Sequence, residues 1–482
     1  MSRIEKDFLG EKQIFKQSLY GIHSVRAREN FPDNTPFHAE WYMAIGQIKL
    51  AYYLTYNSFK NSLSKKSENN LVQFFDDSII EALIESAEEV AEGKYFQHFI
   101  VPAIQGGAGS SINMNVNEII TNVALTKLDL DPGDYDTIDP LEYANIFQST
   151  NDIIPSSLKM ASIKLLVELE DKINGLKLDI EKLEKQSRNK LRIAYTQMEQ
   201  TAPSSYAILF DSYKEALSRD KLRVSKCIER INTLNLGGGE IGTGMAVPQF
   251  FIMEVIPTLQ KLTNLPVKKD ENMTDSTNNL DSLVELHSIL KTHAVDLEKM
   301  VSDIRLLSSD LIGSKEIRIP QKQTGSIIMP EKGNPVIPEF VISVAHKVYA
   351  NDMLVSSLSA QGCLDMNPYL PVIGNAILDS IKLLIAANKT LKENMFEGLT
   401  INNDLAEDRL YHSSAVATAL TPFIGNTKAS KLAKEIQKSG KDIFRVNSKL
   451  KLIDPDKLEK ILSTQNILKQ GFTLNDLKDF GE

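Results

Sequence analysis

The sequence predicts a mainly α-helical fold with a central bundle of long helices. Apolar residues recur at three- and four-residue steps over segments of about 25 residues or more, and glycine-rich loops interrupt these segments. A chain of 482 residues is also too long for one simple core. We therefore expect three domains: an N-terminal domain over 1–145, a central long-helix domain over 146–398 and a small C-terminal helical domain over 399–482.

The first part of the chain is predicted to mix short helical stretches with loops, because turn-forming residues cluster at 31–36 and 131–134. The pattern changes after Pro155. From Leu158 to Leu183, apolar residues recur at helical steps with charged residues between them. This periodicity predicts one long amphipathic helix.

Three more long helices are expected further along the chain. One runs from about Leu283 to Leu311, one follows Pro335 and one follows Pro371. Shorter helices and a turn at 453–456 are expected after Leu399. Long helices with apolar residues on more than one side usually need partners beyond their own chain, so we expect an oligomer.

Composition excludes several classes of protein. The net charge of -9 argues against nucleic acid and anionic membrane as partners, and no apolar run reaches membrane-spanning length. The N-terminus lacks the apolar core of a signal peptide. Cys227 and Cys363 are far apart and suggest no disulfide scaffold, which favours a reducing compartment such as the cytoplasm.

The segment 325–339, GSIIMPEKGNPVIPE, is the strongest candidate for a catalytic loop. Its glycines permit backbone shapes that other residues resist. Ser326 in such a loop can face backbone N–H groups and Lys332, which would stabilise its alkoxide or a nearby oxyanion. Asn334 followed by Pro335 predicts the start of a helix.

A second polar segment, 105–118, reads QGGAGSSINMNVNE. Three glycines, two hydroxyl groups and three asparagines suit a loop that donates hydrogen bonds to an anion. The alternative is a helix N-terminus capped by Ser110 or Ser111. The sequence alone leaves both interpretations open.

Shorter motifs are weaker signals on their own. The segment 148–152, QSTND, is typical of a helix cap. Thr196 and Gln197 are expected to end the first long helix. The segment 237–244, GGGEIGTG, is not part of a strand–turn–helix unit, so it is a poor match to a dinucleotide loop. The seven histidines show no metal-ligand spacing, and we expect neither a metal nor an organic cofactor.

Together these segments resemble the motifs of the aspartase/fumarase superfamily, in order and over essentially the whole chain. The serine loop is similar to Gly-Ser-Ser-x-x-Met-Pro-x-Lys-x-Asn-Pro, and 105–115 to Gln-Gly-Gly-Ala-Gly-Thr-Ser-x-Asn-Met-Asn. The segment 20–31, YGIHSVRARENF, and the LLSS of 306–309 resemble aspartases more than fumarases. The resemblance implies a homotetramer whose central helices form a shared bundle and whose active sites combine three subunits.

The resemblance also implies roles for individual residues. Ser326 would be the base, and Ser110, Ser149 and Thr150 would hold the substrate's side-chain carboxylate. The other implied substrate-binding residues are Asn151 at the leaving group, Lys332, Asn334 and Thr196 at the second carboxylate, Arg26 in support, and Gln197. Fumarases have histidine at the position of Gln197, and glutamine cannot take a proton, so this residue favours ammonia over water as leaving group.

The leading interpretation is a carbon–nitrogen lyase that eliminates ammonia from L-aspartate to give fumarate. Departures from the family motifs keep other interpretations open. Ile327 stands where relatives carry a second serine, Glu331 replaces a small residue, and Tyr143 and Ile146 replace His and Lys. The alternatives are a fumarate-forming lyase for malate, an N-substituted aspartate or another succinyl compound, and a catalytically silent structural or ligand-binding homologue.

Overall fold

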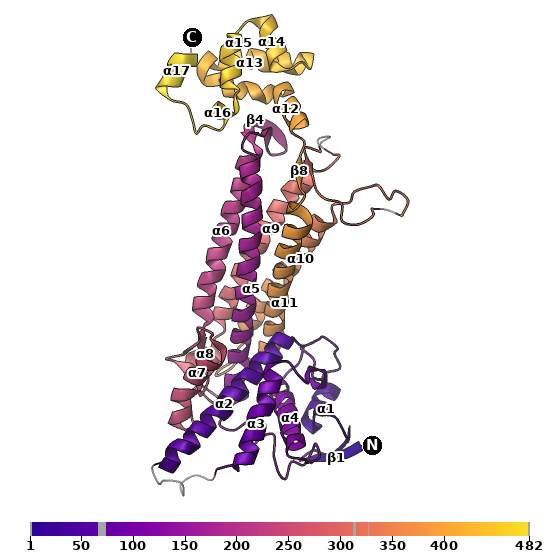
Figure 1. Cartoon of the computed structure of the whole chain (residues 1–482), viewed down its shortest axis with the longest axis vertical. Coiled ribbons are helices and arrows are strands. Elements are labelled where there is room, and N and C mark those ends of the chain that lie inside the picture. The colour runs from indigo at the N-terminus through magenta and orange to yellow at the C-terminus, as the bar shows by residue number, and fades with distance from the viewer. Residues whose placement is uncertain (1, 66–73, 312–314, 326, 481–482) are drawn as a thin grey trace. The chain divides into compact units, whose positions relative to one another are not determined.

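The computed structural model describes residues 2–65, 74–311, 315–325 and 327–480 (Figure 1). Ser326, the predicted base, lies outside the described residues. The chain divides into two compact units. The first comprises Met1–Glu170, Arg223–Thr292 and His346–Leu384, and the second comprises Asp171–Leu222, His293–Ala345 and Ile385–Glu482.

The first unit is built from helices with two small two-stranded sheets, one antiparallel (β1–β2) and one parallel (β5–β6). Its complete elements are β1 Ser2–Asp7, β2 Gly10–Phe15, α1 Ile22–Asn30, α2 Ala39–Lys65, α3 Asp77–Ala91, the 3-10 helix η2 Phe96–His98, α4 Ser110–Lys127, β5 Thr233–Leu234, α7 Gln249–Thr263, β6 Lys268–Lys269 and α8 Met273–Asn278.

Five long helices contribute residues to both units: α5 Thr150–Gln186, α6 Tyr206–Ile231, α9 Asp281–Leu307, α10 Val336–Ser359 and α11 Leu370–Thr390. The remaining elements belong to the second unit. They are β3 Leu191–Thr196, β4 Glu199–Ser205, β7 Ile317–Arg318, the π-helix η3 Leu391–Phe396, β8 Thr400–Ile401, α12 Asn403–His412, the 3-10 helix η4 Ser414–Leu420, α13 Thr421–Ser439, α14 Ile443–Leu450, α15 Pro455–Ile461, α16 Thr464–Ile467 and α17 Leu474–Phe480.

The predicted mainly α fold with long helices is confirmed, because each sheet among the described residues has only two strands. Three of the four predicted long helices begin close to their expected positions, as α9, α10 and α11. The first, α5, begins at Thr150, so Pro155 lies inside the helix. Helix α6 was not predicted, although its buried residues Tyr206, Phe210, Tyr213 and Leu217 recur at the helical period.

The expectation of only short helices in the first part of the chain is wrong. Helix α2 is 27 residues long and packs against α3, α4 and α7. Buried residues lie on most sides of this helix, among them Trp41, Tyr42, Ile45 and Tyr52, which are all fully buried. A helix that is apolar on most sides has no single hydrophobic stripe, and the periodic signal is therefore weak.

Thr196 and Gln197 do not end the first long helix, as was predicted. Helix α5 ends at Gln186, and β3 and β4 form an antiparallel hairpin with Thr196 opposite Glu199. The two turn residues, Gln197 and Met198, both have positive φ, 52° and 68°. Positive φ at both central positions gives the turn a twist that matches the flanking strands.

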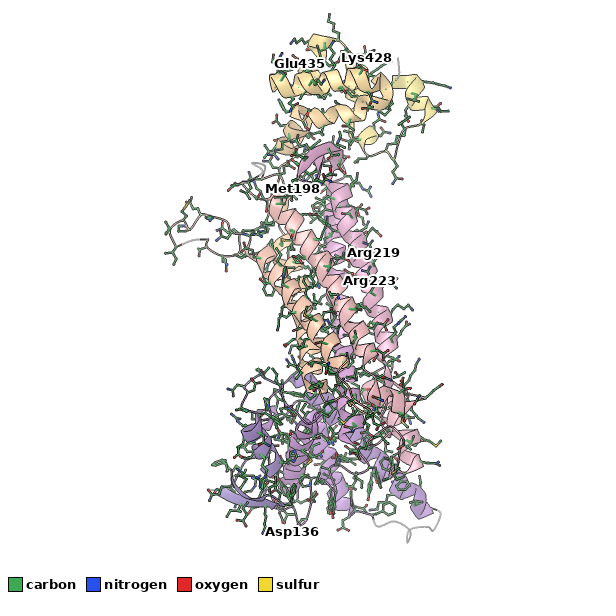
Figure 2. The ribbon with its side chains drawn as sticks, turned by 180° about the vertical axis from the view of Figure 1, so that it is seen from behind. Asp136, Met198, Arg219, Arg223, Lys428 and Glu435 are labelled. Carbon is green, nitrogen blue, oxygen red and sulfur yellow. The ribbon has the colours of Figure 1, made fainter. Side chains whose placement is uncertain are left out.

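Burial of the first hairpin strand explains why this segment is extended. Leu191 and Ile193 are buried in a hydrophobic core formed with the C-terminal helices, including Leu410, Val416 and Leu432. This core fixes the base of the hairpin. The side chain of Met198 at its tip is 78% exposed (Figure 2).

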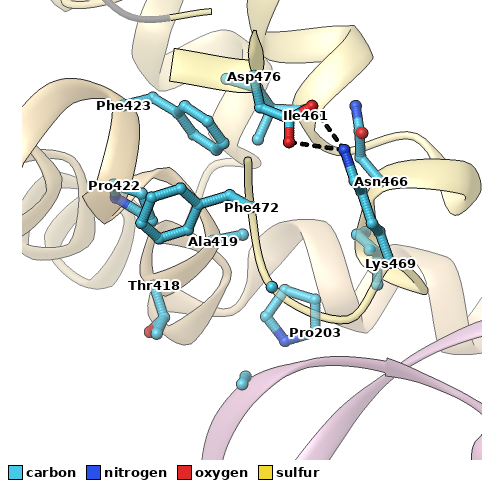
Figure 3. A pocket seen from close by; sticks show the side chains of 13 residues that line it. Pro203, Thr418, Ala419, Pro422, Phe423, Ile461, Asn466, Lys469, Phe472 and Asp476 are labelled. Carbon is cyan, nitrogen blue, oxygen red and sulfur yellow. Dashed lines mark hydrogen bonds and ion pairs between the residues drawn. The ribbon is translucent and has the colours of Figure 1, made fainter. Parts of the chain in front are cut away.

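The C-terminal part of the second unit contains a cavity of about 230 Å³ (Figure 3). Phe423 and Phe472 contribute its apolar lining, and Lys469 and Asp476 form an ion pair of 2.6 Å at its edge. Thr473 also donates backbone and hydroxyl hydrogen bonds to Asp476. None of the predicted site residues lines this cavity, so it is separate from the predicted site.

One helical stretch among the described residues, Leu370–Phe396, is long and apolar enough to cross a membrane, with a mean hydropathy of 1.6. The expectation that no segment passes this test is therefore wrong on length and composition. However, 67% of the apolar window is buried inside the protein. A core helix of a soluble protein has the same properties, so the stretch is weak evidence for a span.

A buried glutamate joins the N-terminal segment to α4. Glu118 accepts hydrogen bonds from the backbone N–H groups of Gly21 (2.8 Å), His23 (2.9 Å) and Ser24 (3.3 Å), and from the Ser24 hydroxyl. These donors are the free N–H groups at the start of α1. Burial, with a further contribution from the charge of Glu5, raises the pKa of Glu118 to about 7 against these hydrogen bonds.

This raised pKa predicts a pH-dependent stability. Between about pH 4.5 and 7 the native state holds a proton on Glu118 that the unfolded state releases, so the free energy of unfolding falls as pH rises. We expect the wild type to lose on the order of 3 kcal/mol across this window relative to Glu118→Gln, which does not titrate. Urea unfolding of both proteins at several pH values measures this difference, and a constant difference would contradict it.

Candidate active site

The predicted site residues of the first unit, apart from Arg26, lie at the start of two helices. Ser110 is the first residue of α4, and Thr150 is the first residue of α5. Gly109 has a φ of 91°, and a Cβ added to it would lie 3.0 Å from Cγ2 of Ile154 in α5. Glycine therefore permits both the turn and the close approach of the two helix starts. Free N–H groups at helix N-termini favour bound anions.

Helix α4 begins without a side-chain cap. Gly109 is the N-cap residue, and Ser110 is exposed with its N–H bonded to the carbonyl oxygen of Gly107 (2.9 Å). The predicted anion loop is therefore only the stretch before Ser110, because Asn113, Asn115 and Asn117 are buried inside the helix. The alternative prediction, a helix start at Ser110, is confirmed, although the expected serine cap is wrong.

Ser149 caps α5. Its hydroxyl oxygen accepts the N–H of Asn151 at 3.2 Å, and the Asp152 carboxylate accepts the N–H of Ser149 at 3.1 Å. This reciprocal arrangement matches the predicted capping motif. Ser149, Thr150 and Asn151 are all half-buried. The structure thus brings three of the predicted substrate-binding residues together on one helix turn.

Asn151 connects this turn to the glycine-rich loop. Its Nδ2 donates to the carbonyl oxygen of Glu240 at 2.8 Å. In return, Nδ2 of Asn235 donates to the carbonyl oxygen of Asn151 at 3.0 Å. The loop 237–244 therefore serves here as a wall beside the start of α5, which agrees with its poor match to a dinucleotide loop.

Asp152 is fully buried beneath the same turn. Its carboxylate also accepts the N–H of Gly239 at 3.2 Å. Burial raises the pKa of Asp152 to about 7, while these hydrogen bonds and the charge of Lys49 act in the opposite direction. Buried carboxylates whose pKa is shifted in this way by burial and by neighbouring groups are frequent at functional sites.

Arg26 is held in an ion pair within its own unit. Its Nε and Nη2 each lie 2.7 Å from the Asp7 carboxylate, and Nη2 also donates to the carbonyl oxygen of Gly10 at 3.1 Å. The guanidinium keeps the pKa of Asp7 below its ordinary value. These contacts place Arg26 in a partly exposed salt bridge, and its role in supporting the substrate stays a prediction.

The serine loop of the second unit exposes an apolar tip. Ile327 is fully exposed, and Ile328 and Met329 are mostly exposed. The loop closes on itself, because the N–H of Gly325 donates to the carbonyl oxygen of Pro330 at 3.3 Å and that of Lys332 to Met329 at 3.0 Å. Lys332 is exposed, so its ammonium is available to an anion.

Asn334 lies just before α10 and is half-buried. The helix begins at Val336, and the N–H of Val336 donates to the carbonyl oxygen of Asn334 at 2.9 Å. The predicted helix start at Asn334 and Pro335 is therefore confirmed to within one residue.

The sequence matches two family models. Residues 16–350 match the model described as "Lyase", and residues 416–469 match "Fumarase C C-terminus". The aspartate ammonia-lyase of a Bacillus species is 32% identical over 471 residues, which cover 97% of this chain and 98% of the relative. The chain belongs to the aspartase/fumarase superfamily of lyases.

Other members of the superfamily give the same result. The aspartate ammonia-lyase of Helicobacter pylori strain J99 is 33% identical over 470 residues, 97% of this chain and 98% of the relative. A solved fumarate lyase:delta crystallin from Brucella melitensis, bound to cobalt, is 30% identical with a TM-score of 0.89, covering 97% and 99% of the two chains. A class II fumarase from Schistosoma mansoni, 24% identical, shares the fold with a TM-score of 0.86 over 96% and 98%.

The predicted superfamily site falls into two groups within one chain. Arg26, Ser110 and Ser149–Asn151 belong to the first unit, and Thr196, Gln197, Lys332 and Asn334 to the second. In the second group, Thr196 is exposed and its hydroxyl lies 2.6 Å from that of Thr201 in the same hairpin. Among the described residues there is no group of three or more His, Cys, Asp or Glu side chains placed to hold a metal ion.

Two polar residues that connect to the first group were not predicted, Lys49 and the half-buried Asn145. Lys49 donates to Asn145, which also accepts from Asn113, and Asn113 donates to the hydroxyl oxygen of Thr150. Lys49 had a detectable signal, because it shares the buried face of α2 with Ile45 and Tyr52 at helical spacing. A lysine among apolar residues on such a face needs a partner.

Tyr143 marks a departure from the superfamily pattern that also has a structural role. Its ring stacks on Phe75, with the ring centroids 4.3 Å apart. The aromatic ring of Tyr143 therefore contributes packing.

Proposed function

We propose that this chain is an aspartate ammonia-lyase, a carbon–nitrogen lyase that reversibly removes ammonia from L-aspartate in an anti elimination and forms fumarate. The observation that carries the proposal is full-length similarity, at 31–33% identity, to aspartate ammonia-lyases from several bacteria. The two adjacent helix N-termini with Ser110, Ser149 and Thr150 support it, because they suit a carboxylate.

The difficult step is removal of an unacidic proton from the carbon beside a carboxylate. The resulting carbanion becomes accessible when its charge moves onto that carboxylate, which gives a doubly negative aci-carboxylate. Donors that are already oriented stabilise this charge without reorganisation. In the proposal, the hydroxyl groups of Ser110, Ser149 and Thr150 and the N–H groups of α4 and α5 provide these donors.

Ser326 is the proposed base, as a serinate. Free serine is far too weak an acid for this role, so the loop must stabilise its anion through backbone N–H groups and Lys332. Lys332 and Asn334 then bind the second carboxylate with help from Thr196. Closure of the serine loop over the substrate would exclude water and strengthen these contacts.

Purified protein supplied with aspartate should produce fumarate, which is followed by its absorbance near the ultraviolet edge. Malate should remain unchanged. Its dehydration releases water, and Gln197 cannot exchange a proton with that water as the histidine of fumarases would. Argininosuccinate and adenylosuccinate are the comparison substrates. Faster dehydration of malate than deamination of aspartate would reverse the assignment of the leaving group.

The proposal includes a homotetramer with active sites shared between subunits. Large apolar side chains on the long helices support it, because Val167, Leu222, Val295 and Met353 are exposed in the single chain. Inactive Ser326→Ala subunits mixed with inactive Thr150→Ala subunits should regain part of the activity if one site combines both groups. A fully active monomer would contradict the proposal.

Ile327 is the residue that most directly bears on the identity of the substrate. In the superfamily motif this position donates a hydroxyl hydrogen bond to the side-chain carboxylate, and such a bond to a charged group is worth about 1.5–3 kcal/mol. If the substrate is unmodified aspartate, Ile327→Ser should raise kcat/KM by about tenfold or more.

A different outcome at position 327 identifies a different substrate. If the natural substrate is an aspartate derivative, the isoleucine packs against its extra group, and Ile327→Ser weakens that reaction. Kinetics unchanged for every succinyl substrate would show that residue 327 does not contact the substrate. Ile328→Ser, which alters the neighbouring exposed side chain, is the matched control.

Other sequence-based expectations remain predictions. These are the three domain boundaries, the absence of a metal or organic cofactor, and the absence of nucleic-acid and membrane partners. A cytoplasmic location is supported by the two free cysteines, Cys227 and Cys363.

A further inference from the structure

Lys49 occupies an unusual environment for a charged residue. It is fully buried on α2, between Ile48 and Leu50, in a helix whose inner face is aromatic and aliphatic. Its Nζ donates one hydrogen bond, to Oδ1 of Asn145 at 3.2 Å. Burial lowers the pKa of Lys49 well below its ordinary value, and the Asp152 charge acts in the opposite direction. Buried amines without a role are costly, so this position needs an explanation.

Lys49 stands at one end of a chain of hydrogen bonds with a defined direction. Nδ2 of Asn145 donates to the carbonyl oxygen of Gln148 at 3.2 Å, so Asn145 presents its carbonyl oxygen to Nζ of Lys49. The same oxygen receives Nδ2 of Asn113 at 3.0 Å and Nδ2 of Asn117 at 3.2 Å. Asn113 must therefore present its amino group to its neighbours, which settles an amide orientation that is otherwise ambiguous.

This chain ends at a predicted substrate-binding hydroxyl. The second N–H of Asn113 donates to Oγ1 of Thr150 at 3.3 Å. Because that oxygen already accepts a hydrogen bond from the protein, the hydroxyl hydrogen of Thr150 is left to donate elsewhere. A bound carboxylate is the acceptor that the proposed function requires.

We propose that Lys49 is a positioning residue of the proposed reaction: through Asn145 and Asn113, it orients the Thr150 hydroxyl so that the hydroxyl donates to the substrate carboxylate. The inference rests on the proposed function for the identity of the ligand. Lys49 does not contact the substrate itself. Asp152 is buried under the same helix turn, and its charge opposes the lowering of the Lys49 pKa by burial.

A double-mutant cycle tests this connection. Lys49→Met removes the donor with little change in volume, and Thr150→Val removes the hydroxyl. We expect Lys49→Met to lower kcat/KM for aspartate by roughly 10- to 100-fold, and to cause less than a threefold further loss when Thr150 is already valine, since groups that act as a unit are non-additive. Losses that multiply would overturn the proposal.

Two further variants separate positioning from a general structural role. Lys49→Gln retains a donor for Asn145, so it should recover most of the activity lost in Lys49→Met. Lys159→Met is the matched control, because Lys159 is also buried but donates to the carbonyl oxygen of Thr233 (2.9 Å), away from the chain of amides. Equal kinetic losses in Lys49→Met, Lys49→Gln and Lys159→Met would overturn the proposal.

Succinate binding provides a readout that does not depend on turnover. Succinate carries the two carboxylates of the substrate and cannot react, so the rise in Tm that it causes reports binding alone. The same non-additivity between positions 49 and 150 is expected in this measurement. If Lys49→Met does not fold, Asn145→Ala removes the middle of the chain and should show the same coupling with Thr150→Val.

Different results would contradict the proposed function and the role of Lys49. A wild type that binds succinate but deaminates no aspartate contradicts the proposed function and leaves the coupling measurable by binding. An active wild type with independent effects at positions 49 and 150 contradicts only the role of Lys49. A wild type that neither binds succinate nor turns over aspartate overturns both.

Discussion

Ser326→Ala is expected to abolish turnover of aspartate while the protein remains folded. Alanine cannot accept the proton beside the carboxylate, and loss of a catalytic group commonly costs several orders of magnitude in rate. The substitution removes one oxygen atom and adds no bulk, so we expect the variant to fold. Fumarate absorbance under saturating aspartate measures the loss, and circular dichroism with the melting temperature verifies the fold.

A matched serine variant separates loss of the base from a general effect of the substitution. Ser343→Ala alters an exposed serine on α10, whose hydroxyl donates to the carbonyl oxygen of Glu339 at 2.9 Å. This variant should retain the kinetics of the wild type. Turnover by Ser326→Ala close to that of Ser343→Ala would rule out Ser326 as the base.

Thr150→Val is expected to lower kcat/KM for aspartate by about 100- to 1,000-fold, the usual effect of removing one donor to a developing oxyanion. Most of this loss should appear in kcat, because the charge on the carboxylate is greatest in the transition state. Stability should fall by about 1–3 kcal/mol as well, since Asn113 loses the acceptor of one buried N–H group.

Thr121→Val controls for the change in shape. Thr121 is a fully buried threonine on α4 whose hydroxyl has no hydrogen-bond partner in the described structure. Its replacement should leave kinetics unchanged and stability equal or slightly higher. If Thr150→Val retains a normal kcat, the assignment of Thr150 to the substrate carboxylate must be abandoned.

The parts of the fold that were predicted correctly depend on local pattern. The capping motif at 148–152 was identified although the long helix was expected only after Pro155, because such a motif satisfies its own backbone within four residues. Helices α9, α10 and α11 were identified from the spacing of apolar residues. Motif resemblance likewise identified the superfamily, because the functional segments keep their order along the chain.

The errors arose where contacts distant in sequence decide the structure. Residues 191–205 form a hairpin because Leu191 and Ile193 are buried against helices more than 200 residues away in the sequence. The turn has positive φ at Gln197 and Met198 but contains no glycine, so the usual sequence signal for such a turn is missing. The hydrogen bond between Lys49 and Asn145 joins residues 96 positions apart, so local sequence patterns could not predict it either.

Pro155 has a consequence for local stability near the proposed site. Its ring nitrogen carries no hydrogen, so the carbonyl oxygen of Asn151, four residues earlier, is released from the helix and receives Asn235 instead. Each hydrogen bond between this helix turn and the segment 235–240 joins a side chain to a backbone atom. The freed carbonyl oxygen therefore holds α5 to a segment that is itself buried, because Leu236 is fully buried and Asn235 also bonds to Ser156 and Thr277. Amide hydrogen exchange at Gly239 should accordingly be slow, and it should become faster in Asn235→Ala, which lacks the donor to that carbonyl oxygen.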